Sequence, residues 1–165
     1  MLGICNGFQA LIKLGLVPYG DIVPMTAECP TLTFNTIGRH QSRLVRTRVA
    51  SNLSPWLAKT EVGDMHTIAI SHGEGRFVAS DDMLAQLKAN GQIATQYVDE
   101  AGVPGMDLSV NPNGSLLAIE GITSPDGRVF GKMGHSERYS NGTFKNVPGE
   151  KDQPLFAAGV EYFTA

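Results

Sequence analysis

Cys5 stands between two glycines, Gly3 and Gly7, at the start of a segment with helical apolar spacing. A nucleophile elbow, a sharp strand-to-helix turn that projects one reactive side chain, has this form. We expect the turn to be so crowded that a Cβ on either glycine would clash. The N-terminus of the following helix would favour the thiolate, which is the reactive form of cysteine. The pattern therefore predicts a nucleophilic thiol.

A thiol nucleophile needs a base, and a base needs a group that orients it. Four histidines could serve: His40, His66, His72 and His135. His135 follows an apolar segment, and Glu137 lies two residues further on, close enough to reach the far ring nitrogen. A His beside a Glu is more often a surface pair, but nucleophile first and histidine later is the order of α/β elbow enzymes. We predict a Cys5–His135–Glu137 triad, with His40 and His66 structural.

Helices and strands alternate along the segments that would position this triad. Helices are expected over 6–16, 81–89 and 153–163, with a short one near 54–57. Strands are expected over 31–37, 43–50, 65–71, 92–98, 117–123 and 128–133. The last two would form a hairpin just before the histidine. This order predicts an α/β fold with an open, mostly parallel sheet and flanking helices.

Composition limits the class of protein. The chain has 165 residues, 42% of them hydrophobic, and a net charge of −3, which suits one soluble domain over 1–165. The mild acidity argues against a nucleic-acid or membrane partner, and we expect neither a membrane span nor a signal peptide. The two cysteines favour a reducing, cytoplasmic setting, with Cys29 an inert thiol. No ligand spacing predicts a metal site.

Two segments resemble the active-site motifs of class I, triad-type glutamine amidotransferases: 3–11 (GICNGFQAL) and 134–138 (GHSER). Further segments resemble, more narrowly, the glutaminase domains of phosphoribosylformylglycinamidine synthases, which act in purine biosynthesis. These are 71–77 (SHGEGRF), 94–99 (ATQYVD), 111–115 (NPNGS) and 119–135 (IEGITSPDGRVFGKMGH). The GEGRF and NPNGS segments make the resemblance specific, and it extends over about 2–163.

The resemblance implies a flavodoxin-like fold and glutamine as the substrate. Cys5 would form a γ-glutamyl thioester, His135 would move the protons, and Glu137 would orient His135. The backbone N–H of Asn6 would be one oxyanion donor. Ammonia would pass to a synthase domain, in the same chain or in a separate subunit. That partner would bind ATP and Mg²⁺, and we expect no cofactor in this domain.

Members of this family carry several βα units before the elbow, whereas Met1 and Leu2 alone precede it here. We therefore expect a partial glutaminase domain whose sheet is incomplete at the N-terminus. Such a fragment, expressed alone, is expected to fold poorly and to lack measurable glutaminase activity. The alternatives are another class I amidotransferase or related cysteine hydrolase, and a truncated module that only mediates interactions.

Five further residues are candidates for the glutamine pocket. The resemblance implies that Gln9 contacts the glutamyl group, although it could be a helix-surface residue. His72 and Glu74 occupy a loop at a strand end, where ligands bind in open α/β sheets. They would form a pocket wall or a docking face for the synthase, the alternative being a solvated loop. Gln96 and Tyr97 end a strand at the same expected edge of the sheet.

Overall fold

A six-stranded sheet with the order β1-β8-β7-β6-β3-β4 forms the centre of the molecule. The structure is a computed structural model that describes residues 1–140 and 142–164. The strands of this sheet are β1 (Leu2–Ile4), β3 (Gln41–Val49), β4 (Met65–His72), β6 (Ile93–Tyr97), β7 (Ile119–Thr123) and β8 (Phe130–Lys132). Two short strands, β2 (Thr31–Thr33) and β5 (Arg76–Val78), pair separately in antiparallel fashion.

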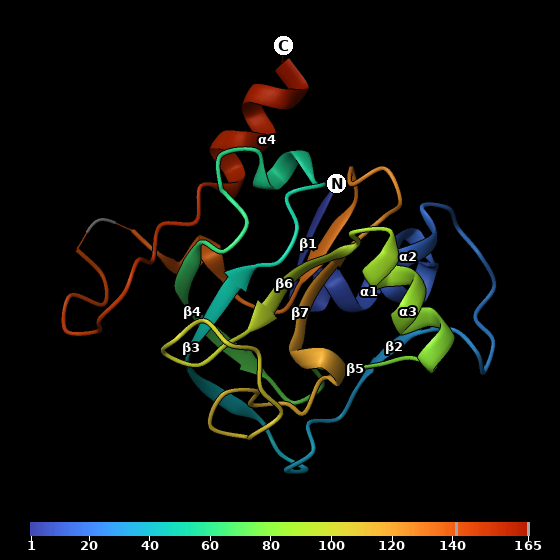
Figure 1. Cartoon of the computed structure of the whole chain (residues 1–165), viewed down its shortest axis with the longest axis horizontal. Coiled ribbons are helices and arrows are strands. Elements are labelled where there is room, and N and C mark those ends of the chain that lie inside the picture. The colour runs from blue at the N-terminus through green and yellow to red at the C-terminus, as the bar shows by residue number, and fades with distance from the viewer. Residues whose placement is uncertain (141, 165) are drawn as a thin grey trace.

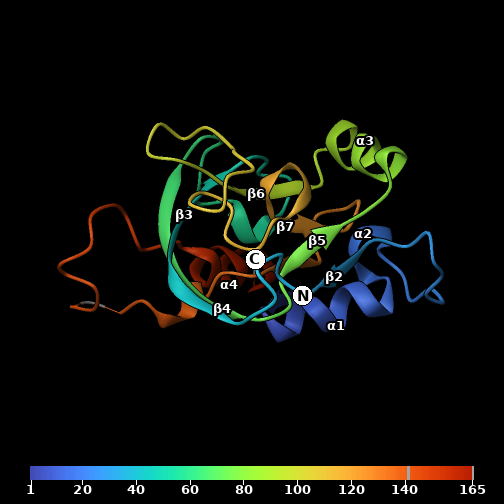
Figure 2. The same ribbon diagram turned by 90° about the horizontal axis from the view of Figure 1, so that it is seen from below.

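The helices cover both faces of this sheet. They are α1 (Asn6–Leu14), α2 (Leu16–Tyr19), α3 (Asp81–Ala89) and α4 (Leu155–Thr164), with short 3₁₀ turns at η1 (Pro55–Leu57), η2 (Leu116–Ala118) and η3 (Ser136–Arg138). Figures 1 and 2 both place α1, α2 and α3 on the side of the molecule away from β3 and β4. No helix in the described part of the chain is long and apolar enough to cross a membrane.

The α/β class and the flanking helices are confirmed, but the expectation of a mostly parallel sheet is wrong. Only β1 and β8 pair in parallel among the described strands, and the other four pairings of the sheet are antiparallel. Parallel neighbours need a long crossover connection, whereas a tight turn joins antiparallel ones. The predicted hairpin at 124–127 is such a turn, and it makes β7 and β8 antiparallel.

The sheet is curled, which Figure 2 shows from below at β3 and β4. β4 is the last strand at one end, and segments from the opposite end contact its outer edge. The backbone N–H of His135 donates to the Ala69 carbonyl at 2.8 Å, and the Cys5 thiol to the Ser71 carbonyl at 3.7 Å. Nearby, the Thr67 N–H donates to the Glu150 carbonyl at 2.6 Å. We call this outer edge of β4, with the segments bonded to it, the seam.

Apolar side chains pack on both faces of the sheet. On one face, α1 presents Phe8, whose ring lies directly over Gly131 of β8, where an added Cβ would come within 2.2 Å of it. On the other face, η1 and the start of α4 cover a second cluster. That cluster comprises Val49, Leu57, Ala94, Phe130 and Leu155. The sheet is therefore held between two apolar layers.

Most predicted elements are present, with shifted ends. α1 ends at Gly15, whose φ of 83° suits glycine. α3 has the predicted bounds, but its N-cap is Ser80, whose hydroxyl accepts the Met83 N–H. A strand is expected over 31–37, but β2 covers only Thr31–Thr33. The sequence predicts no strand at the position of β5. Pairing with β2 holds this segment in the extended conformation.

Candidate active site

Cys5 occupies a strained turn between β1 and α1, as the elbow pattern predicts. Its φ of 52° and ψ of −105° are unusual for a residue with a side chain. The backbone holds this conformation on both sides: the Cys5 N–H donates to the Lys132 carbonyl at 2.8 Å, and the Cys5 carbonyl accepts the Gln9 N–H at 3.1 Å. The thiol is thereby projected from the end of the sheet at the start of a helix.

The two flanking glycines differ in their surroundings. A Cβ at Gly3 would lie 2.5 Å from a Leu11 methyl group and 2.8 Å from the Gly7 carbonyl, so the expected clash is confirmed there. A Cβ at Gly7 would meet nothing within 4 Å, and the same expectation is wrong for that position. Gly7 already belongs to α1, where an added side chain points into open space.

His135 and Glu137 are joined as the predicted base and its orienting group. His135 Nδ1 lies 2.5 Å from Glu137 Oε1, which makes this nitrogen the protonated one. His135 Nε2 is buried and has no hydrogen-bond partner among the described residues. The second ring nitrogen is therefore left as an acceptor, which is the form that a general base requires.

The seam holds the segments that carry this imidazole and the thiol at one strand edge. Cys5 and His135 contact carbonyls of residues two apart on β4, Ser71 and Ala69. Such carbonyls are about 7 Å apart along a strand. Two segments separated by some 130 positions in sequence are thus held at neighbouring points of one strand edge.

Burial raises the pKa of the Cys5 thiol, so the expectation that its resting form is thiolate is wrong. The backbone of Asn6 and the exposed Arg138 pull this pKa down, while Glu137 adds to the increase. Desolvation outweighs the helix N-terminus because the charged form loses water on burial. The arrangement therefore requires a base to remove the proton when a substrate arrives.

Gln9, Glu74 and His72 come together around one loop. The Gln9 side-chain amide donates to the Glu74 carbonyl at 2.6 Å, which links α1 to the loop that follows β4. His72 is buried, and its Nδ1 lies 3.2 Å from Asn35 Oδ1. Burial lowers the pKa of His72 to about 4, which keeps it neutral. His72 thus supports the loop from beneath, while the Glu74 side chain is exposed.

The two specific sequence segments bond to each other. The Gly75 carbonyl of the GEGRF segment accepts hydrogen bonds from Asn113 Nδ2 at 2.6 Å and from the Ser115 hydroxyl at 3.3 Å. The Ser115 hydroxyl also accepts the Phe77 N–H at 3.0 Å. The NPNGS turn is therefore buried, and it fixes the loop that Gln9 contacts.

The side chains of Gln96 and Tyr97 lie in different surroundings. Gln96 Oε1 accepts a hydrogen bond from the Arg48 guanidinium at 3.0 Å, and its side chain lines a cavity of about 720 Å³ that includes no triad residue. Tyr97 is fully buried, and its hydroxyl accepts a bond from Asn113 Nδ2 at 3.2 Å. Cys5 is among the groups that influence the pKa of Tyr97, which burial raises.

Two charged residues were missed by the sequence analysis. Glu120 and Lys132 are completely buried, and their Oε1 and Nζ atoms lie 3.6 Å apart beneath the His135 segment. The signal was present in the sequence, because each is a charge inside an otherwise apolar strand. The described residues include no group of three or more His, Cys, Asp or Glu side chains that could hold a metal ion.

Comparison with known proteins gives one family. The family model described as "CobB/CobQ-like glutamine amidotransferase domain" matches residues 1–163. The chain is 39% identical over 140 residues to phosphoribosylformylglycinamidine synthase subunit PurQ of Aquifex aeolicus, which covers 85% of this chain and 56% of that protein. It is 34% identical over 164 residues to the subunit of the same name from Methanosarcina mazei, covering 99% and 64%.

A solved structure has the same arrangement. The "Structure of PurLQS from Thermotoga maritima" matches with a TM-score of 0.69 and 30% identity, covering 98% of this chain and 61% of the matched chain. The chain described above thus spans about three fifths of the length of the proteins that it matches.

Proposed function

The chain belongs to the CobB/CobQ-like glutamine amidotransferase family, and we propose that, as part of a complete glutaminase domain, it hydrolyses the side-chain amide of glutamine with Cys5 as the nucleophile. His135 is the general base and acid, and Glu137 is its orienting carboxylate. Gln9, His72, Glu74 and Tyr97 shape or support the glutamine site. Gln96 has the weakest claim, because it is bonded to Arg48.

The reaction proceeds in two stages. His135 Nε2 removes the Cys5 proton as the sulfur attacks the amide carbon, and the resulting imidazolium is stabilised by Glu137. The backbone N–H of Asn6 stabilises the oxyanion that develops on the former carbonyl oxygen. The imidazolium then gives its proton to the departing ammonia, which leaves a γ-glutamyl thioester. Water, deprotonated by His135, releases glutamate and restores the thiol.

The ammonia is used, in this proposal, by a synthase partner that converts formylglycinamide ribonucleotide to formylglycinamidine ribonucleotide with ATP and Mg²⁺. The names of the relatives support this, since they are subunits of phosphoribosylformylglycinamidine synthase. ATP and Mg²⁺ belong to the partner, and no residue of this chain is assigned to them. The two free thiols suit a cytoplasmic location.

One observation carries the proposal. The Cys5 thiol, on a turn with positive φ, and the backbone N–H of His135, whose Nε2 is buried and unpartnered among the described residues, bond to carbonyls two residues apart on one strand edge. His66 and His72 also have a buried ring nitrogen without a partner among the described residues, and His135 differs from them in that a carboxylate, that of Glu137, contacts its other nitrogen. The free acceptor beside a thiol is what nucleophilic catalysis requires.

A glutamine analogue that carries an electrophilic chloroketone in place of the amide tests this function. We expect it to modify Cys5 stoichiometrically and to spare Cys29, as located by mass spectrometry of the digested chain. His135→Asn is expected to slow the modification by about 10²–10⁴-fold, since it removes the base. Free glutamine should protect Cys5. Equal modification of both cysteines, or no protection by glutamine, would contradict the proposal.

A further inference from the structure

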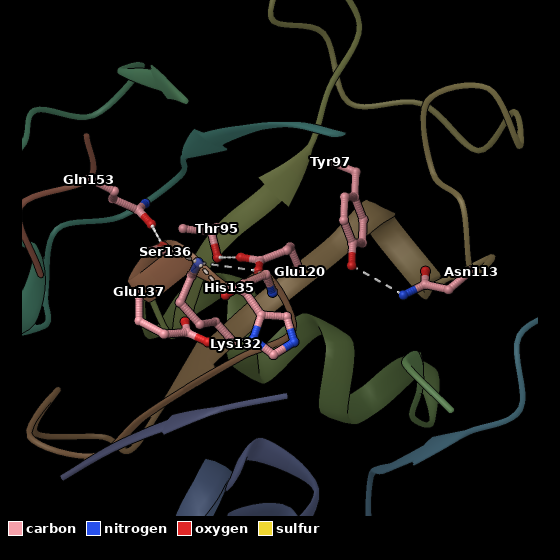
Figure 3. A network of polar contacts seen from close by, with 10 residues as sticks. Thr95, Tyr97, Asn113, Glu120, Lys132, His135, Ser136, Glu137 and Gln153 are labelled. Atoms are coloured by element: carbon pink, nitrogen blue, oxygen red, sulfur yellow. Dashed lines mark hydrogen bonds and ion pairs between the residues drawn. The ribbon is translucent and has the colours of Figure 1, made fainter. Parts of the chain in front are cut away.

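The ion pair of Glu120 and Lys132 lies directly under the segment that carries His135. Both side chains are completely buried, whereas the other Lys–Glu pair among the described residues, Lys59 with Glu161, is at the surface. Burying two charges costs several kcal/mol per ion unless further hydrogen bonds satisfy them. Figure 3 shows the Lys132 ammonium surrounded by polar side chains from β6, β7 and the segment after β8. The cost indicates that the pair has a role that apolar side chains would not fill.

The pair holds Gly134, the residue before His135, from both sides of its backbone. The Gly134 N–H donates to Glu120 Oε1 at 2.5 Å, and the Gly134 carbonyl accepts from Lys132 Nζ at 3.0 Å. A Cβ at Gly134 would lie 2.9 Å from Glu120 Oε1, so the fit is close. The Thr95 hydroxyl donates to the other carboxylate oxygen of Glu120 and fixes its orientation.

The residue after His135 is held by the same ammonium. Lys132 Nζ donates to the Ser136 hydroxyl at 2.8 Å, and that hydroxyl donates to Gln153 Oε1 at 2.7 Å. Both neighbours of the imidazole are therefore anchored to one side chain. Rotation of the His135 backbone would break at least one of these bonds.

Lys132 also contacts the nucleophile through its backbone. Its carbonyl accepts the Cys5 N–H at 2.8 Å, and Lys132 pairs with Ile4 in the parallel register of β1 and β8. One residue thus holds the nucleophile by its main chain and both neighbours of the base by its side chain. Burial lowers the pKa of Lys132 and the charge of Glu120 opposes this, as expected for a dry ion pair.

We propose that Lys132, with Glu120, is a positioning residue that sets the distance and angle between the Cys5 thiol and the His135 imidazole. This inference rests on the proposed glutamine hydrolysis and extends it to residues that do not touch the substrate. Neither side chain transfers a proton or contacts the glutamyl group. Their effect is on geometry, where a misplacement of about 1 Å can cost about a hundredfold in rate.

The principal test is the double variant Lys132→Met with Glu120→Gln. Removing one partner alone would leave a buried charge and destabilise the fold, whereas removing both charges need not. Gln at 120 can still accept the Gly134 N–H, but Met at 132 cannot hold Gly134 and Ser136. The matched control is Lys59→Met with Glu161→Gln, an ion pair whose side chains are 41% and 70% exposed.

Labelling of Cys5 by the chloroketone analogue gives the first readout. We expect the double variant to reduce the maximal labelling rate about a hundredfold, with the half-saturating concentration changed less than about threefold. The pH profile of Cys5 alkylation by iodoacetamide should also move to higher pH, because the base no longer faces the thiol. Cys29 is the internal reference within each sample. The control variant should match the unmodified chain.

The outcomes separate this inference from the function on which it rests. A folded double variant with an unchanged labelling rate and pH profile would overturn the positioning role. A lower melting temperature with unchanged kinetics would do the same, since it indicates a structural role only. If the unmodified chain is not labelled at Cys5, the proposed function fails, and the alkylation pH profiles still decide whether Lys132 positions the thiol and imidazole.

Discussion

The two cysteines lie in different surroundings, and the one with the lower pKa is not the proposed nucleophile. Cys29 lies in the loop between α2 and β2, where the Thr26 hydroxyl and N–H contact its sulfur and lower its pKa. Cys5 lies at the seam, where burial raises its pKa. Of the two, Cys5 alone lies at this strand edge, where the backbone N–H of His135 bonds two residues away.

The difference shows that reactivity toward a specific substrate is separate from readiness to ionise. A lowered pKa raises the fraction of thiolate at rest, and thiolate reacts without help from a base. A thiol that stays protonated until a base removes its proton is protected against such reagents. The surroundings of Cys5 therefore favour reaction with a specific substrate over reaction with other electrophiles. The surroundings of Cys29 do not make this distinction.

Replacing each cysteine by serine gives the largest contrast. Cys5→Ser is expected to lower labelling by the chloroketone analogue by about 10⁴-fold or more, since the nucleophile is lost. Cys29→Ser should leave the labelling rate of Cys5 within about twofold, because surface substitutions far from a site have small effects. Mass spectrometry of labelled peptides measures both. A strong effect of Cys29→Ser would break the distinction between the two regions.

Substitution of the elbow glycines tests how tightly the Cys5 region is built. Gly3→Ala is expected to lower the free energy of unfolding by about 3 kcal/mol, because its Cβ would meet the Gly7 carbonyl. Gly7→Ala should raise it by about 0.5–1 kcal/mol, because alanine favours helices and nothing lies within 4 Å. Urea denaturation gives both values. Equal destabilisation would show that the turn is crowded on both sides.

Acid is expected to weaken the seam side of the molecule through His72. Its folded pKa of about 4 is below the usual 6.5, so the unfolded chain binds the extra proton between these values. Stability is therefore lost as pH falls through this window, by about 3 kcal/mol for this one group. Urea denaturation of the unmodified chain and of His72→Gln, at about pH 7 and pH 4, measures the difference. Parallel losses in both proteins would remove His72 as the cause.

A small neutral alkylating agent should reverse the order of the two cysteines. With iodoacetamide at about pH 8 and no glutamine analogue, we expect Cys29 to react about tenfold faster than Cys5, because its pKa is lower and it is less buried. Peptide mapping over time gives both rates. Faster alkylation of Cys5 would indicate that its thiolate forms at rest, contrary to the effect of burial.

Sequence reasoning could propose the residues whose type and spacing indicate a chemical role. Cys5, His135 and Glu137 could be proposed from the glycine-flanked thiol and the i, i+2 spacing, and the helix at 81–89 could be predicted from the aspartates that begin it and the Asn90–Gly91 pair that ends it. The antiparallel pairing of the sheet could not, because segment order alone does not distinguish hairpins from crossovers. The balance between burial and helix dipole at Cys5 also depends on packing that only the fold supplies.

The network under His135 needed the structure for a different reason. Glu120 and Lys132 are 12 positions apart, and their pairing depends on the register of β7 and β8. Gln96 and Tyr97 show the same limit, since adjacent residues of one strand point to opposite faces. Sequence indicated which residues are unusual, and the sheet decided which of them meet.

The seam has a consequence for solubility. β4 ends the sheet, and the exposed backbone groups of an end strand can pair with another chain and start aggregation. Here the groups of Thr67, Ala69 and Ser71 are occupied by Glu150, His135 and Cys5. Opening the seam would move the thiol-bearing segment away from the imidazole-bearing segment, and it would also expose the unpaired backbone groups of β4. The hydrogen bonds that hold the proposed nucleophile and base therefore also cover the strand edge.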